Sequence, residues 1–483
     1  MNGDFSRDTS GPAHLARYTR VLLQQGRPLL DADFNEQGAI HHDFLRTLAT
    51  DLLGRGWRPG LGQFSITTPA ADGFTITQGH FYVDGILCDN PADCSYALQP
   101  FLPHPPPIGT ASFLVYVECR ERHLNAIQRP ALYEVALGGP DTASRAQMIW
   151  QVRTANAAWI GQQTALLEQS LKLRIEVVAE PEKTALTTFQ GKLPGLASSL
   201  SADINATTPV AADVTLHAQA WFDAAARVPP RLRAMAGALA GDDDACAMAP
   251  DAHYRGRENQ LYRVEIHQGS TLGNAKPTFK WSRENGSVMF GVRSGQAIAA
   301  SEALNGRITY TIALDTLGHD RRDGVCVGDW VEAVDESIEL DALTPALGKV
   351  IQVDRSKRSV QVDVADEPGN GFAGCKALRR WDQGAQVDNR GTIALVETSD
   401  AQAPWIALEL GIQIQFQPGG LYRPGDYWMI PVRVSGGVQW PAVAGKPAFA
   451  AADGVQRHRA AIGYASATGG SFTLHDAGRT MQP

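Results

Sequence analysis

Short alternating segments separated by turn residues run through most of this chain, and they restrict its fold more than any other feature. Beyond an N-terminal stretch, apolar and polar residues alternate with the period of a half-buried strand. Asp84-Gly85 predicts a two-residue turn that pairs Val83 with Ile86 and Phe81 with Cys88. This region therefore predicts an antiparallel hairpin.

A second turn signal, Asn285-Gly286, predicts a hairpin in the C-terminal half, with Trp281 opposite Phe290 and Phe279 opposite Val292. Further strand-like segments follow at 308–314, 330–334, 349–353, 359–364, 412–416 and 427–432. Many short strands with frequent turns are typical of antiparallel sandwiches and small barrels.

The N-terminal residues follow a helical period instead. Asp31 and Asp33 can cap a helix, and Gly54 marks its end. Apolar residues recur at every fourth position along one side of this helix, namely Ile40, Phe44, Leu48 and Leu52. We expect this face to pack on the chain's own sheets or on a neighbouring molecule.

The stretch 155–248 is rich in Ala and Leu, with helical segments at 162–173 and 216–226 and an acidic loop at 241–246. We interpret it as an inserted, mainly helical module. The chain is therefore predicted to be mainly β and multi-domain, with antiparallel sandwiches or small barrels, an N-terminal helical segment and this insertion. The expected ranges are an N-terminal helical docking segment (1–60), a β domain (61–154), the variable helical insertion (155–248), a β-hairpin region continuing the β core (249–300) and C-terminal β structure (301–483).

Composition argues against several classes of protein. The 483 residues include 43 basic and 51 acidic side chains, a net charge of −8 that argues against a nucleic-acid partner. No apolar run reaches the roughly 20 residues that span a bilayer, and the N-terminus lacks the apolar core of a Sec signal peptide. Six scattered cysteines form no Cys-x-x-Cys pair, which is typical of a reduced compartment. We therefore expect synthesis in the cytoplasm and no transmembrane segment.

Linear motifs that carry chemistry do not occur in the sequence. His41 and His42 are adjacent on the predicted helix, so they point about 100° apart and do not share one ion in the usual way. The run 242–244 lacks the alternating spacing of a calcium loop. Neither a Gly-x-Ser-x-Gly elbow nor a phosphate-binding loop is present. We expect no catalytic residue, no cofactor and no metal site, and a structural or binding role rather than an enzymatic one.

Several longer stretches, taken together, resemble a known family. They are Gly26–Gln37, Tyr82–Cys88, Glu134–Arg145 with Trp150–Val152, Tyr254–His267, Phe279–Ser287, Leu378–Asp382 and Gly425–Arg433. Over about residues 5–460 the chain resembles a bacterial family of domains of unknown function found in gene clusters for phage-tail-like contractile injection systems. No catalytic residues are established for that family, so the resemblance transfers none.

The resemblance implies a structural component of a contractile, phage-tail-like particle that acts through assembly. Its place would be peripheral, as a baseplate, fibre- or spike-associated protein or as a cap or adaptor. Its partners would be other copies of itself, in closed homo-oligomers such as trimers, pentamers or hexamers, and baseplate, tube or sheath proteins. We expect assembly in the cytoplasm and release with the particle.

Five residues are candidates for contacts with partners. Arg379 and Arg380, with Asp382 around Trp381, predict either a buried ion-pair network or an intersubunit contact. Three aromatic residues could stack on sugar rings if they are exposed, namely Trp405, Tyr422 and Trp440. The alternative function is therefore a surface-recognition module that binds cell-surface glycan. A weaker alternative is a carbohydrate-active effector enzyme, because paired carboxylates need no linear motif.

Overall fold

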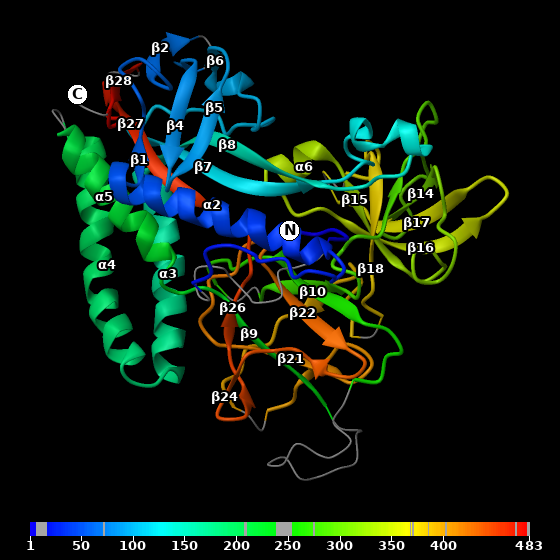
Figure 1. Cartoon of the computed structure of the whole chain (residues 1–483). Helices are drawn as coiled ribbons and strands as arrows, with labels where there is room; N and C mark the ends of the chain where they lie inside the picture. Colours follow the sequence, from blue (N-terminus) through cyan, green and yellow to red (C-terminus); the bar gives the residue numbers. More distant parts are fainter. Residues whose placement is uncertain are drawn as a thin grey trace.

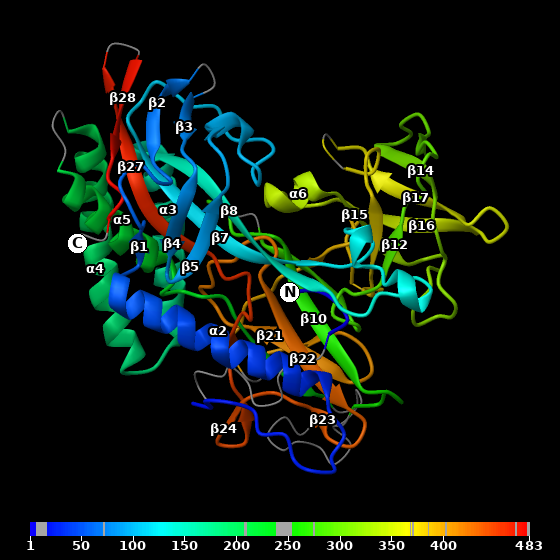
Figure 2. The ribbon, with the colours of Figure 1, turned by 45° about the horizontal axis from the view of Figure 1, so that its top comes forward.

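Three β bodies make up most of the chain, with a layer of helices on one side and one separate helix, α2, lying across the front (Figures 1 and 2). The computed structural model describes residues 1–5, 17–70, 73–206, 210–237, 254–273, 276–367, 369, 371–384, 386–400, 403–468 and 471–480. The prediction of a mainly β, multi-domain chain with an N-terminal helix is confirmed.

The first body, here called the terminal body, contains strands from both ends of the chain. Its longest sheet has the order β28-β27-β7-β8 and shares a core with the sheets β1-β4-β5 and β2-β3-β6. His458 near the C-terminus pairs with Cys119, so a late segment completes an early sheet. The strands are β1 (Gly56–Trp57), β2 (Ile66–Ala70), β3 (Gly73–Ile76), β4 (Gly79–Val83), β5 (Ile86–Asn90), β6 (Cys94–Ser95), β7 (Phe113–Leu124), β8 (Arg145–Asn156), β27 (His458–Thr468) and β28 (Ser471–Asp476).

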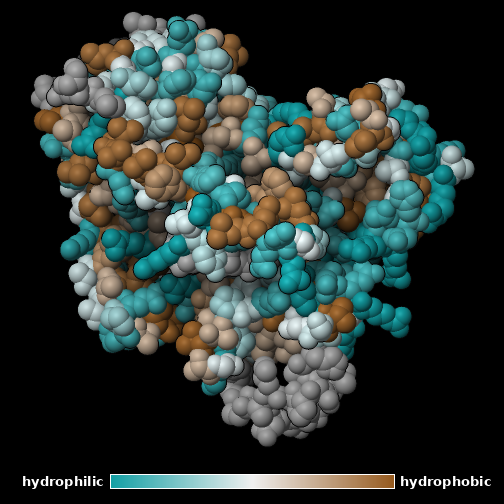
Figure 3. All heavy atoms as spheres, in the orientation of Figure 1, coloured by the Kyte–Doolittle hydropathy of each residue, from teal (hydrophilic) through white to brown (hydrophobic). Residues whose placement is uncertain are grey.

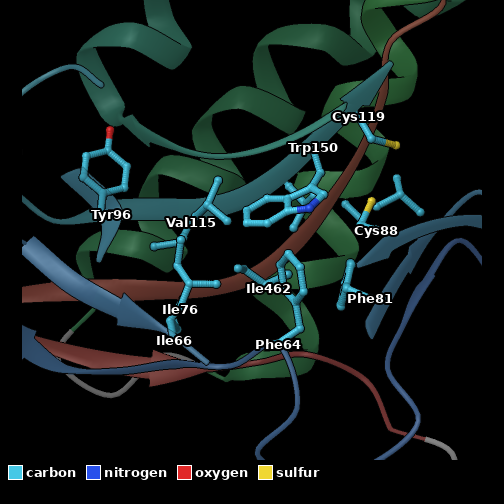
Figure 4. Packing of buried hydrophobic residues seen from close by; sticks show 14 of the residues in the cluster. Phe64, Ile66, Ile76, Phe81, Cys88, Tyr96, Val115, Cys119, Trp150 and Ile462 are labelled. Atoms are coloured by element: carbon cyan, nitrogen blue, oxygen red, sulfur yellow. The ribbon is translucent and has the colours of Figure 1, made fainter. Parts of the chain in front are cut away.

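The core of the terminal body is built around Trp150 (Figure 4). Its indole meets the ring of Phe64 edge to face at 5.0 Å, and its Nε1 donates a hydrogen bond to the Asp89 carbonyl at 2.7 Å. The N–H of a buried Trp usually finds a hydrogen-bond partner, because leaving it unpaired costs free energy. Here it has one.

The β4–β5 hairpin forms as predicted. Val83 pairs with Ile86 and Phe81 with Cys88. Asp84-Gly85 has positive φ angles of 48° and 72°, the type I′ geometry whose twist matches the flanking strands.

The second body, here called the middle body, is a sandwich of two antiparallel sheets, β19-β11-β10-β22-β23 and β20-β21-β9-β26. A small β24-β25 ribbon lies beside it. Its strands are β9 (Arg231–Ala236), β10 (Gln260–Gln268), β11 (Thr278–Ser282), β19 (Ile393–Ala394), β20 (Ile406–Ala407), β21 (Ile412–Phe416), β22 (Tyr427–Arg433), β23 (Gly437–Val438), β24 (Ala442–Val443), β25 (Lys446–Pro447) and β26 (Ala450–Ala451).

The third body, here called the distal body, is a seven-stranded antiparallel sheet of order β12-β18-β15-β16-β17-β14-β13. It encloses its own apolar core. Its elements are β12 (Met289–Gly291), β13 (Ala299–Ala300), β14 (Arg307–Ala313), β15 (Trp330–Val334), the short helix α6 (Glu336–Leu340), β16 (Leu347–Asp354), β17 (Ser359–Ala365) and β18 (Ala377–Trp381).

The predicted hairpin at Asn285-Gly286 is wrong in its pairing. The two residues do form a turn with positive φ angles of 49° and 64°. However, β11 before the turn pairs with β10 in the middle body, and β12 after it pairs with β18 in the distal body. The Asn285 N–H donates a hydrogen bond to the Leu261 carbonyl, which holds the turn against β10 of the middle body. After the turn the chain continues into the distal body. The Asn-Gly pair therefore predicted the turn itself, but it did not determine which strands pair.

Four longer helices complete the fold: α2 (Asp31–Leu53), α3 (Ala157–Val177), α4 (Glu182–Asn205) and α5 (Ala211–Ala225). The last three cover the outer face of β7 and β27, where Tyr116 and Tyr464 pack with Ile160 and Trp221. The acidic loop predicted at 241–246 lies outside the described residues. In the described part of the chain, no helix has both the length and the apolar character to cross a membrane.

Candidate assembly surface

Helix α2 turns its apolar side to solvent. It spans Asp31–Leu53 and stops at Gly54 as predicted, but the predicted capping by Asp31 and Asp33 is wrong, because both lie within the first turn and no side chain caps the N-terminus. Of its four predicted apolar positions only Ile40 is buried, while Phe44, Leu48 and Leu52 are 64%, 43% and 73% exposed. A face that was expected to be covered is therefore open in the single chain.

The segment before the helix adds to this open face. Residues 17–30, here called the strap, are exposed throughout except at the half-buried Val21. The Val21 N–H donates a hydrogen bond to Oε1 of Gln37 at 2.8 Å, so the strap folds back beside the N-terminal half of α2 (Figure 2). Its exposed large apolar side chains are Tyr18, Leu22, Leu23, Leu29 and Leu30.

Together the strap and α2 form one surface, here called the α2 surface (residues 17–53). Ten of the large hydrophobic side chains that are exposed in the described part of the chain fall between Tyr18 and Leu52. In the space-filling view, hydrophobic residues gather along the course of α2 (Figure 3). At these exposures the ten side chains present roughly 1,000 Å², which exceeds the largest apolar patch of a typical monomer and is comparable to one side of a stable interface.

The turn of the β4–β5 hairpin holds α2 in position. Gly85 lies so close to the helix that a Cβ added there would collide with the Arg46 carbonyl, and its φ of 72° also favours glycine. Arg46 Nη2 donates to Glu121 Oε1 at 2.7 Å. Arg55, just after the helix, pairs with Asp84 at 2.7 Å. These contacts hold α2 against the terminal body with its outer face toward solvent.

The predicted candidates Arg379 and Arg380 lie inside the chain and form a buried ion-pair network, one of the two predicted alternatives. Arg380 is 3% exposed, pairs with Asp382 at 3.3 Å and donates to the Arg322 carbonyl at 2.6 Å. Arg379 is 8% exposed and reaches Glu332 at 3.5 Å.

Arg379 belongs to a larger group of charges between the middle and distal bodies, here called the charged junction. It comprises Arg263, Glu265, Lys280, Glu332 and Arg379, all at most 8% exposed. Lys280 lies between the two carboxylates, 3.2 Å from Glu265 and hydrogen-bonded to Glu332, and 4.2 Å over the Trp381 ring. Arg263 pairs with Glu265 at 2.6 Å. Every charge in the junction therefore has an opposite partner.

A cavity of about 350 Å³ lies beside the junction, where all three bodies meet. Burial opposes ionisation of Glu265, but Arg263 and Lys280 outweigh it and lower the pKa of that carboxyl to about 2. Burial, reinforced by Lys280, lowers the pKa of His267 to about 3. Burial and Arg379 lower the pKa of His123 to about 4. The His123 and His267 imidazoles, which line the cavity, are therefore neutral at pH 7.

The three aromatic candidates differ in their access to solvent. Tyr422 is 3% exposed in the core of the middle body, so the condition set for sugar stacking is not met there. Trp405 is half-buried with the Arg233 guanidinium 5.0 Å from its ring centre. Trp440 is half-buried and donates its Nε1 hydrogen to the Ala448 carbonyl at 2.8 Å. Glycan contact by Trp405 and Trp440 stays a prediction.

Sequence reasoning missed the strap, although its signal was visible. Six large apolar residues and three arginines stand in residues 17–30 without one acidic residue, directly before a helix with an apolar face. Within the described ranges, no three His, Cys, Asp or Glu side chains come together as metal ligands. The run at 242–244 is outside those ranges.

Comparisons with known proteins give one extensive match. The family model described as "Family of unknown function (DUF6519)" matches residues 1–473 of the chain. No curated protein matches it. Among solved structures, a chain titled "Crystal structure of TssK" aligns with 10% identity over 82% of this chain and 98% of that chain, with a TM-score of 0.14. At such a score two chains need not share a fold.

Proposed function

The chain belongs to this family of unknown function, DUF6519, and we propose that it is a non-enzymatic structural component of a phage-tail-like contractile injection particle. It acts through assembly, as a peripheral baseplate, fibre- or spike-associated protein or as a cap or adaptor. The gene-cluster context comes from the sequence resemblance. The observation that carries the assembly role is the open α2 surface.

The energetic argument concerns apolar side chains in water. Fully burying a Leu or Phe side chain contributes about 1.5–3 kcal/mol relative to exposure, so covering half-exposed ones contributes about half as much each. Ten such side chains on one surface favour association even after the cost of ordering two partners is subtracted. Scattered exposed leucines are ordinary on any protein, but this concentration on one helix and its strap is not.

The arrangement of charges supports a role without catalysis. Within the junction, the Lys280–Glu332 pair crosses from the middle body to the distal body, and Glu265 and Arg379 complete the network on either side. A more exposed ion pair joins the terminal body to the distal body, where Arg122 Nη2 reaches Glu336 Oε1 at 2.5 Å. Ion pairs that hold the three bodies in a fixed arrangement support a structural role in a particle.

A peripheral place follows from having one concentrated docking surface. A subunit inside a continuous tube or sheath needs at least two separate interfaces to continue the array. The exposed large apolar residues outside the α2 surface are dispersed over all three bodies and the helices. One strong contact closes a small assembly instead of continuing an array, which supports a place at the edge of a particle.

The test is sedimentation of a native lysate through a dense cushion, with mass spectrometry of the pellet. We expect the chain to pellet with sheath and tube proteins in a fixed ratio. Leu45→Glu/Leu48→Glu, which keeps good helix formers on α2, should leave the chain in the supernatant. The matched control Leu304→Glu/Val327→Glu alters residues that are 74% and 63% exposed elsewhere, and it should still pellet.

A wild-type chain that stays in the supernatant while sheath and tube proteins pellet would overturn the proposal. Glycan binding lost on Trp405→Ala or Trp440→Ala would then favour the recognition module. Hydrolysis of cell-wall polysaccharide, lost on changing one carboxylate, would favour an enzyme.

A further inference from the structure

We infer that the α2 surface docks onto a second copy of this chain, with the two α2 helices antiparallel and the strap of each copy beside the C-terminal half of the other's helix. This inference rests on the proposed function, because it names the occupant of the same surface. Three observations carry it: the charges of the strap and helix, the spacing of residues on the helix, and the place of the strap.

The two parts of the α2 surface carry opposite charge. The strap has Arg17, Arg20 and Arg27 and no acidic residue. Helix α2 has one arginine, Arg46, which is held by Glu121, against the exposed Asp31 and Asp51 and the half-buried Asp33 and Asp43; a fifth acidic residue, Glu36, is buried. When two copies are related by a two-fold rotation, the basic part of each copy can face the acidic part of the other. Such charge complementarity favours contact between two identical chains.

The outer face of α2 has the residue spacing of a helix–helix seam. Its positions are separated alternately by four and three residues: Phe34, Gly38, His41, Leu45, Leu48 and Leu52. This is the spacing of the a and d positions through which two helices interlock. All six residues are exposed, so no segment in the described part of the chain packs against this seam.

The seam is symmetric for an antiparallel partner. Rotation about residue 43 places Phe34 opposite Leu52, Gly38 opposite Leu48 and His41 opposite Leu45. The glycine therefore meets a leucine rather than another glycine, and the phenylalanine meets a leucine at each end. Such alternation of large and small residues lets two faces interdigitate.

The position of the strap agrees with this register. Because Val21 is bonded to Gln37, residues 17–21 lie beside the N-terminal half of their own helix. In the antiparallel pair that half faces the C-terminal half of the second helix, which carries Asp51. Arg17 and Arg20 of one copy thus come beside Asp51 of the other. A membrane surface fits less well, because anionic lipid would repel the exposed Asp51 beside the apolar stripe.

The experiment measures the mass of the full-length purified chain by light scattering and sedimentation velocity across a range of concentrations. We expect a dimer that dissociates on dilution. Leu45→Glu/Leu48→Glu should be monomeric at every concentration, whereas Leu304→Glu/Val327→Glu should dimerise like the wild type. Circular dichroism of each variant verifies that it is folded.

Charge reversal tests the register. Arg17→Glu/Arg20→Glu and Asp51→Arg should each raise the dissociation constant at least tenfold, because each places like charges together. When the two variants are mixed, the strap of each faces a helix of opposite charge, so a heterodimer should form with an affinity close to that of the wild type. A mixture no tighter than its components would overturn the antiparallel arrangement.

Two results separate this inference from the proposed function. A wild-type chain that is monomeric yet pellets with sheath and tube proteins would overturn self-docking and leave the particle role standing. A dimer that never pellets with particles would do the reverse. A closed ring of three or more copies through the α2 surface would overturn the two-fold pairing.

Discussion

The α2 surface and the charged junction differ in which side chains they expose to solvent and which they bury. At the junction, five charged groups are buried and each is matched by an opposite charge. At the α2 surface, ten large apolar groups are exposed and no described segment covers them. Charge inside connects the bodies of one chain, and apolar area outside is available to another molecule. The charged junction therefore fixes the internal geometry of the chain, and the α2 surface is where we propose that assembly takes place.

The largest effect on stability should come from breaking the junction. In Glu332→Leu, Lys280 and Arg379 stay buried with one carboxylate fewer, and the Trp381 indole loses its acceptor at 2.7 Å. Leaving a buried charge uncompensated costs about 3–5 kcal/mol. Urea denaturation should show that loss, while Glu367→Ala, which breaks an exposed pair with Arg390, should cost less than about 1 kcal/mol. Equal losses would remove the distinction between buried and exposed charge.

Acid should weaken the junction region through its neutral histidines. The folded-state pKa of His267 is about 3, below the unfolded value near 6.5. As the pH falls below 6.5 the unfolded chain takes up a proton that the folded chain does not, so the free energy of unfolding decreases. At pH 5 this amounts to about 2 kcal/mol for His267. His267→Asn should reduce the difference between unfolding at pH 7 and pH 5 by that amount.

The control for this pH dependence is His41→Asn, because His41 is exposed and its hydrogen-bond partner is the Gln37 amide rather than a carboxylate. It should leave the difference between the two pH values unchanged. An unaltered pH dependence in His267→Asn would show that the buried imidazole is not responsible.

A smaller effect should follow from releasing α2 from its support. Gly85→Ala introduces a Cβ that collides with the Arg46 carbonyl and strains a φ of 72°. We expect a loss of about 1–3 kcal/mol. Limited proteolysis should cut first within residues 31–53, whereas Gly445→Ala, which has a similar φ of 75° and open space around it, should keep α2 intact.

The smallest effect on stability should come from the α2 surface itself. Leu45→Glu/Leu48→Glu exchanges side chains that are 60% and 43% exposed, so at a dilution where the wild type is monomeric the free energy of unfolding should change by less than about 0.5 kcal/mol. The same variant should lose association completely. A large loss of stability would instead mean that these leucines serve the interior of the single chain.

Local signals in the sequence predicted local structure well. The bounds of α2 and the β4–β5 register follow from apolar spacing, Gly54 and the Asp84-Gly85 turn, all of which act within a few residues. The pairing of β27 with β7 could not be predicted, because it joins residues more than three hundred positions apart through backbone groups common to every strand. The terminal body is accordingly built from segments near both ends of the chain.

The candidate site was less accessible to sequence reasoning. The spacing of Ile40, Phe44, Leu48 and Leu52 predicted an apolar face but could not state what covers it. For Arg379 and Arg380 the sequence left two alternatives, and the choice depended on Glu332 and Asp382, whose positions only the fold determines.

The most direct test of the central claim is amide hydrogen exchange of the chain diluted until it is monomeric, compared with the chain within purified particles. If the α2 surface is the docking surface, amides in residues 17–53 should exchange at least ten times more slowly in the particle, while exchange in β7 and β18 stays unchanged. Unaltered exchange in residues 17–53, with new protection elsewhere on the chain, would contradict the account.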